Sequence, residues 1–217
     1  MTPLTLTQEY LICTIDKKGS LPSYSQETAA CLIISGLLEM EAESCISVVG
    51  KKIAVRGKLP ENLSVLAPLY HTLRKKRPTK LQKILDRYLL SCSRKRLRAL
   101  SASIMAPLRE ENLAVSVFSG LIKKREQFAP TKEAQEQVIQ KIRQELLENA
   151  PLTENTAALA LLLNKAGCLK HYFSKQERKE LKIRLEEIKN GDGDKRIKDW
   201  LNQTETMLTL LYIVSGL

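Results

Sequence analysis

The chain has 217 residues, of which 43% are hydrophobic and 27% are charged. This composition is typical of a globular protein and excludes a wholly disordered chain. The 35 lysines and arginines outnumber the 24 acidic residues, and the net charge of +11 favours a polyanionic partner, either nucleic acid or an anionic membrane. The positive charge is concentrated in residues 51–100, which carry +13, whereas residues 1–50 carry −4 and residues 101–217 carry +2.

Cysteine usage and hydropathy restrict where the protein works. The five cysteines are an odd number and no Cys-x-x-Cys occurs, so we expect no disulfide framework and a reducing, cytoplasmic environment. The N-terminus lacks the charged start and apolar run of a signal peptide. Apolar runs such as 157–163 are much shorter than the roughly 20 residues that a membrane-spanning helix needs. Any membrane contact is therefore expected to be peripheral.

The N-terminal half is predicted to be helical with one hairpin. Thr5 and Gln8 form the pattern of a capping box, which starts a helix that ends near a turn at 16–19. A second helix is predicted over 26–43, and a short hairpin follows over 45–55. Three further helices are expected over 61–76, 79–90 and 93–111, the last disturbed at Pro107.

The second half begins with another hairpin, formed by a strand over 113–118, a turn at 119–120 and a returning strand over 121–128. Helices follow over 131–148, 153–165, 174–189 and 194–214, and Ser174 with Glu177 forms a second capping box. We therefore predict a mainly α protein, in which residues 1–217 form a single-domain helical bundle with two short peripheral β-hairpins.

No group of residues in the sequence points to catalysis. The two histidines are His71 and His171, and Cys168-x-x-His171 lacks the second pair of ligands that a zinc site needs. The segment 192–194 superficially opens a calcium loop, but Arg196 and Gln203 stand where ligands are required. Because no phosphate-binding loop or nucleophile motif occurs either, we expect no enzymatic activity, metal, cofactor or small-molecule substrate.

The basic residues cluster at the start of the helix predicted over 93–111, where Arg94, Lys95, Arg96 and Arg98 occupy four of five positions. Cations at a helix N-terminus oppose the helix dipole, so this cluster favours a bound anion. A merely solvated basic face is the alternative that involves no ligand.

Two anionic partners fit this cluster. The helix over 93–111 and the hairpin over 113–128 mimic a winged helix with Lys123, Lys124 and Arg125 in the wing, which predicts binding of duplex nucleic acid. Alternatively, the same cations face anionic lipid head groups, where each contributes about 1 kcal/mol near the surface. The aromatic content of 5% disfavours stacking on single strands. Charge alone does not separate duplex from membrane.

The order of motifs along the chain resembles that of the Golgi phosphoprotein 3 family. Residues 4–12 (LTLTQEYLI) are similar to its opening LTLxEExLL, and residues 16–19 (DKKG) resemble its DxxG turn. The passage from 36–42 into 46–48 is similar to the helix-to-strand passage of the family, and 104–113 resembles the segment before its hairpin. Further similarity lies at 156–169 and in the closing helix at 205–214. The resemblance covers essentially the whole chain in order.

The resemblance implies a helical bundle edged by β-hairpins and a peripheral membrane protein that recognises phosphatidylinositol 4-phosphate without catalysis. The head-group pocket of the family uses a tryptophan and three arginines. In this chain, Tyr24 occupies the position of the tryptophan and Arg98 keeps one of the arginines. Ile33 and Ser101 occupy the positions of the other two arginines. The implied head-group site comprises Tyr24, Arg94, Lys95, Arg96 and Arg98, in which the three extra cations supply positive charge.

The second hairpin is implied to contact the membrane. Its predicted contacts are Phe118, Leu121, Ile122, Lys123, Lys124 and Arg125. The expected partner is anionic membrane lipid, protein partners or a homo-oligomer stay open, and nucleic acid belongs only to the winged-helix alternative.

Overall fold

The computed structural model describes residues 3–22, 26–49, 51–74, 78–90, 94–119, 125–148, 150–191 and 195–215. The described helices are α1 (Leu6–Thr14), α2 (Gln26–Ala42), α3 (Ala67–Leu73), α4 (Leu81–Leu89), α5 (Lys95–Glu110), α6 (Lys132–Leu146), α7 (Glu154–Lys165), α8 (Lys175–Asn190) and α9 (Lys195–Ser215), with short 3-10 helices η1 (Glu61–Leu66) and η2 (Leu169–His171). The described strands are β1 (Ile46–Val49), β2 (Lys52–Val55), β3 (Thr79–Lys80), β4 (Ala114–Ser119) and β5 (Arg125–Pro130). The prediction of a mainly α protein is confirmed.

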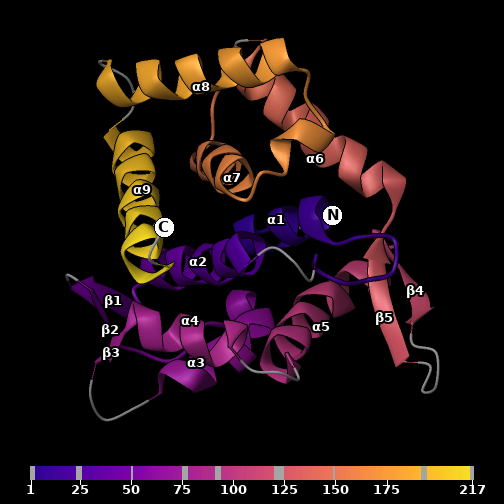
Figure 1. The fold of residues 1–217 in the computed structure, drawn as a ribbon, viewed down its shortest axis with the longest axis vertical. Helices are drawn as coiled ribbons and strands as arrows, with labels where there is room; N and C mark the ends of the chain where they lie inside the picture. Colours follow the sequence, from indigo (N-terminus) through magenta and orange to yellow (C-terminus); the bar gives the residue numbers. More distant parts are fainter. Residues whose placement is uncertain are drawn as a thin grey trace.

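Helices α1 and α2 lie in the middle of the molecule (Figure 1). Every residue of α1 except Gln8 is buried, and α2 is buried continuously from Thr28 to Met40. A helix that is covered on all sides belongs to the centre of a fold. Helices α6 to α9 enclose this pair on one side, and α3, α4 and α5 enclose it on the other (Figure 1).

Two capping boxes were predicted and both are present. In the first, Gln8 N donates to Thr5 Oγ1 at 3.3 Å while Thr5 N donates to Gln8 Oε1 at 3.0 Å. In the second, Glu177 N donates to Ser174 Oγ at 3.2 Å and Ser174 N donates to Glu177 Oε2 at 2.7 Å. Such reciprocal bonds pair backbone donors that a helix start would otherwise leave without partners.

A third residue that holds the start of α1 was not predicted. The buried carboxylate of Glu39, on α2, accepts from Thr7 N at 3.0 Å and from Thr7 Oγ1 at 2.6 Å. The negative charge lies at the positive end of the α1 dipole. Glu39 therefore links the two central helices.

The segment predicted as one helix over 61–76 is instead η1 followed by α3, which ends at Leu73. Leu63 has a non-helical backbone (φ −106°, ψ 15°), and Pro68 stands in the first turn of α3. Proline has no N–H to donate, so it fits a helix start better than a helix interior. The first two residues of the helix predicted over 79–90 form β3, because Lys80 and Thr79 pair with Lys52 and Ile53 of β2.

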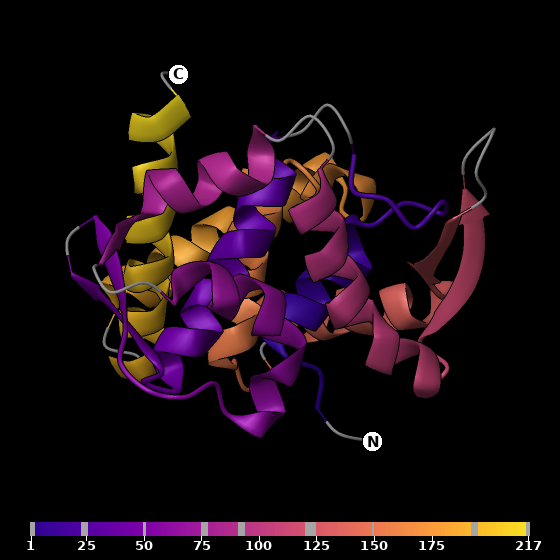
Figure 2. The ribbon, with the colours of Figure 1, turned by 90° about the horizontal axis from the view of Figure 1, so that it is seen from below.

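The second hairpin has a different register from the predicted one. Its returning strand was expected over 121–128, whereas β5 begins at Arg125 and ends at Pro130. Ala114 pairs with Pro130, and Phe118 pairs with Glu126. This register places Phe128 against the core and 5.4 Å from the guanidinium of Arg109 on α5. Figure 2 shows this hairpin at the edge of the molecule away from α9.

The expected disturbance of α5 at Pro107 is small, because the helix continues to Glu110. Pro107 lies in the last turn, where only one hydrogen bond is lost. The described cysteines, Cys13, Cys31, Cys45 and Cys168, are buried free thiols. Within the described ranges, no helix is both long enough and apolar enough to cross a bilayer.

Candidate functional site

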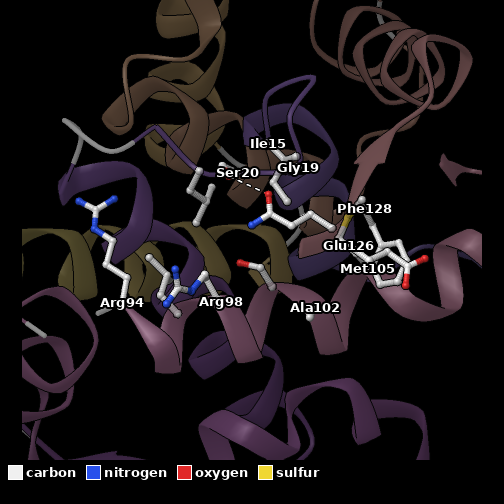
Figure 3. Close-up of a pocket in the computed structure, with 13 residues that line it drawn as sticks. Ile15, Gly19, Ser20, Arg94, Arg98, Ala102, Met105, Glu126 and Phe128 are labelled. Atoms are coloured by element: carbon white, nitrogen blue, oxygen red, sulfur yellow. Dashed lines mark hydrogen bonds between the residues drawn. The ribbon is translucent and has the colours of Figure 1, made fainter. Parts of the chain in front are cut away.

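A groove of about 420 Å³ lies between the loop after α1, one side of α5 and strand β5. The cations Arg94 and Arg98 lie at one end of this groove, and Met105, Glu126 and Phe128 lie at the other (Figure 3). The groove is therefore basic at one end and mixed polar and apolar at the other.

The loop that forms one wall is shaped by its own sequence. Asp16 Oδ1 accepts from Lys18 N and from Ser20 N, each at 2.9 Å, and Asp16 O accepts from Gly19 N at 2.9 Å. Gly19 has φ +73°, a left-handed conformation that glycine adopts without strain. This is the turn that the sequence predicted at 16–19.

The same loop is fastened to β5. Ser20 Oγ donates to Gln127 Oε1 at 3.0 Å, as the dashed line in Figure 3 marks. A Cβ atom added at Gly19 would lie 2.7 Å from Gln127 Cβ and 3.0 Å from Phe128 O. Only a residue without a side chain allows this close approach of loop and strand. Gly19 therefore sets the width of the groove.

The opposite wall is the beginning of α5. Arg94 precedes the helix in a left-handed backbone conformation (φ 47°, ψ 23°), and it makes no side-chain cap. The first turn contains no acidic residue. Arg94 and Arg98 are four residues apart, lie on one side of the helix, and both line the groove. A strained residue and an uncapped, cationic helix start favour an anion at this end.

Glu126 carries the negative charge of the groove. Its Oε1 accepts from Ser116 Oγ at 2.8 Å and lies 3.8 Å from Arg109 Nη1. Both side chains of the Arg109–Glu126 pair are about half exposed, so their attraction is weak. These bonds hold the carboxylate at the β5 end, away from the Arg94 end in Figure 3.

The predicted head-group residues separate into three groups. Arg94 and Arg98 share the groove, whereas Lys95 and Arg96 are exposed and do not line it. Arg96 Nη1 instead donates to Arg87 O, on α4, at 3.4 Å. Tyr24 lies outside the described residues.

The positions at which the other two family arginines fall also differ. Ser101 lines the groove one turn beyond Arg98, whereas Ile33 is wholly buried in α2. An arginine at position 101 would therefore face a ligand in the groove, whereas the side chain of Ile33 cannot reach the groove.

Two of the predicted hairpin contacts fall on described residues. The side chain of Phe118 is 69% exposed, and Arg125 is described through its backbone, as the first residue of β5. The other four, Leu121, Ile122, Lys123 and Lys124, lie outside the described residues.

Three polar residues of the groove, Ser20, Glu126 and Gln127, were not predicted from the sequence. The turn at 16–19 signalled the loop, but nothing local indicated that it meets a strand more than 100 residues later. In the part of the chain that the structure describes, no cluster of three or more histidine, cysteine, aspartate or glutamate side chains could hold a metal ion. The groove offers two guanidinium groups, two hydroxyls, an amide and a carboxylate, groups that can bind the phosphate and the hydroxyls of a phosphorylated polar molecule.

Comparison with known proteins adds a family match. The family model described as Golgi phosphoprotein 3 (GPP34) matches residues 6–204. No curated protein matches the chain. The family match spans the groove, the second hairpin and the first half of α9.

Proposed function

We propose that this chain, which belongs to the Golgi phosphoprotein 3 family, is a peripheral membrane protein that binds anionic lipid head groups in the groove between α5 and β5. The observation that carries the proposal is that Arg94 and Arg98 line one groove together with Ser20 and Gln127. By family resemblance the preferred head group is phosphatidylinositol 4-phosphate. The activity is binding, without catalysis.

The two arginines would hold the phosphate. Guanidinium groups donate charge-assisted hydrogen bonds to phosphate oxygens, and the backbone N–H groups at the start of α5 favour an anion at the same place. Arg94 takes over the role of the cation that Ser101 cannot supply, because it lies on the same side of α5 two turns earlier. Ser20, Gln127 and Glu126 can hydrogen-bond to the hydroxyl groups of an inositol ring.

The hairpin would provide a separate contact with the bilayer. Phe118 lies one residue before the end of β4 and is 69% exposed, so its ring is accessible to a bilayer. Transfer of an aromatic ring from water to the membrane interface is favourable. The predicted contacts at Leu121 and Ile122 would add to this apolar insertion.

Vesicle flotation tests the proposal with three compositions, namely phosphatidylcholine alone, with phosphatidylserine, and with phosphatidylinositol 4-phosphate. Each arginine–phosphate interaction is worth about 1.5–3 kcal/mol, so Arg98→Ala should weaken binding to the phosphoinositide vesicles by about 10- to 100-fold. Arg184→Ala is the control, because it removes the same charge from α8, outside the groove. Equal, negligible binding of the unmodified protein to all three compositions would disprove the proposal.

Duplex nucleic acid is the alternative partner. It predicts a DNA mobility shift with a steep salt dependence, weakened by changing Lys123, Lys124 and Arg125 to alanine. A recognition helix has to enter the major groove of DNA, whereas the side of α5 that carries Arg98 forms a wall of the groove beside the 15–21 loop. The geometry therefore favours a small anionic group over a duplex.

A further inference from the structure

A row of side chains crosses the three-stranded sheet outside the groove. Val49 pairs with Lys52, and Lys52 pairs with Lys80, so the three residues lie side by side on strands β1, β2 and β3. All three are exposed, Val49 to 66%. The neighbouring pair, Ile53 and Thr79, is buried. Because directly opposed residues share a face of a sheet, the row belongs to its outer face.

The row continues along α4. Lys83 and Arg87 are four residues apart and lie on one side of α4, and Lys80 and Leu90 immediately precede and follow this helix. Lys83 and Leu90 are exposed, Leu90 to 67%, and Arg87 is partly exposed. The buried side of the helix is formed by Leu81, Ile84, Leu85 and Tyr88.

We name these six residues, Val49, Lys52, Lys80, Lys83, Arg87 and Leu90, the basic strip. The strip leads toward the start of α5, because Arg96 donates to the carbonyl of Arg87. Figure 1 shows the sheet, α4 and α5 in this order across the lower part of the molecule. Four of the 15 basic residues of 51–100 thereby lie in one row that leads toward the groove.

The arrangement costs stability in the isolated protein. Lys52 and Lys80 are like charges in directly opposed positions, which destabilises a strand pair. Among the described residues, no salt bridge joins a lysine of the strip to a carboxylate. Asp86 is the one acidic residue in α4. A negatively charged partner would remove this repulsion.

We propose that the basic strip is a second membrane contact, which holds the protein on an anionic bilayer independently of the head group in the groove. The inference rests on the proposed function. Exposed aliphatic side chains stand at both ends of the strip, Val49 and Leu90. A bilayer interface accepts both aliphatic groups and cations, whereas the phosphate backbone of a nucleic acid offers nothing apolar to Val49. Charge complementarity and this apolar flanking together favour lipid.

Phosphatidylserine vesicles without phosphoinositide isolate the strip from the groove. The test variant replaces Lys52, Lys80 and Lys83 by glutamine. The control variant replaces Lys175, Lys179 and Lys182, which are exposed, by glutamine. These control lysines lie on α8, on the opposite side of the molecule from α4 in Figure 1. Both variants lose three positive charges, so they differ only in where the charge is lost.

The strip variant should bind phosphatidylserine vesicles on the order of 100-fold more weakly than the unmodified protein, at about fivefold per lysine. The control should change binding by less than about threefold. Added salt should weaken the binding of the unmodified protein and reduce the difference between the variants. Far-UV circular dichroism should show unchanged folding, because all the replaced side chains are exposed.

The outcomes separate the strip from the groove. If the strip variant binds phosphatidylserine as the unmodified protein does, or no worse than the control, the strip proposal is wrong. The groove proposal still holds in that case if the protein prefers phosphoinositide vesicles and Arg98→Ala abolishes this preference. If the unmodified protein binds no vesicle, both proposals fail. If it binds duplex DNA instead, and the strip variant loses that binding, the partner is nucleic acid and the membrane assignment is overturned.

Discussion

Replacing Gly19 by alanine should move the loop of the groove away from β5. Gly19 has φ +73°, and a left-handed backbone costs a residue with a side chain about 1–2 kcal/mol. The new methyl group would lie 2.7 Å from Gln127 Cβ and 3.0 Å from the carbonyl oxygen of Phe128. A backbone atom cannot rotate away, so over-packing adds about 1–3 kcal/mol. We expect the free energy of unfolding to fall by about 2–5 kcal/mol, or the loop to detach and the groove to open.

Gly167 provides a matched control. It has φ +67°, but nothing lies within 4 Å of the position that its Cβ would take. Gly167→Ala should therefore lose only the backbone contribution of about 1–2 kcal/mol. Urea denaturation of both variants measures the difference, and flotation on phosphoinositide vesicles should show weaker binding for Gly19→Ala alone. Equal losses of stability with unchanged binding would refute the idea that the loop–strand contact shapes the groove.

Three further predictions concern the core, the hairpin and the whole chain. Burial raises the pKa of Glu9 above 4.5 although Lys141 Nζ lies 2.8 Å from Oε1. The unmodified protein therefore loses stability as pH rises from 4.5 through the folded pKa. In urea denaturation, the free energy of unfolding of Glu9→Gln relative to that of the unmodified protein should increase between pH 4.5 and 7. A decrease over this range contradicts the prediction. Phe118→Ser should leave the melting temperature unchanged because the ring is 69% exposed, yet weaken vesicle binding about tenfold, and a lower melting temperature with unchanged binding argues against insertion. We propose that residues 1–217 form one domain, which predicts coincident unfolding transitions by Trp200 fluorescence and circular dichroism, whereas two separate transitions indicate two domains.

The helices and their starts could be predicted from local sequence. A capping box needs two side chains three residues apart, as in Thr5 and Gln8, so a short window contains all the atoms that matter. The apolar face of the segment 26–43 likewise predicted a helix, although not that α2 is buried continuously from Thr28 to Met40. The split of the 61–76 segment was missed although Pro68 was visible, because a proline is compatible both with a helix start and with an interrupted helix.

The groove could be predicted only in part. The cations at the start of α5 were recognised from their density, and the turn at 16–19 from its Asp and Gly. Which of these cations line the groove depends on which side of α5 is covered. Arg94 and Arg98 line the groove, whereas Arg96 contacts α4. Likewise, the caps that Glu39 supplies to α1 and the bond between Ser20 and Gln127 join residues 32 and 107 positions apart.

The sequence by itself determined the helical content, the capped helix starts and the concentration of positive charge in residues 51–100, because each depends on neighbours within a few residues. The tertiary structure decided how that charge is used. Pairing of β3 with β2 sets Lys80 beside Lys52, and the packing of the 16–19 turn on β5 makes a groove beside Arg94 and Arg98. These arrangements depend on contacts between distant segments, which form only when the buried faces of the helices and strands pack together.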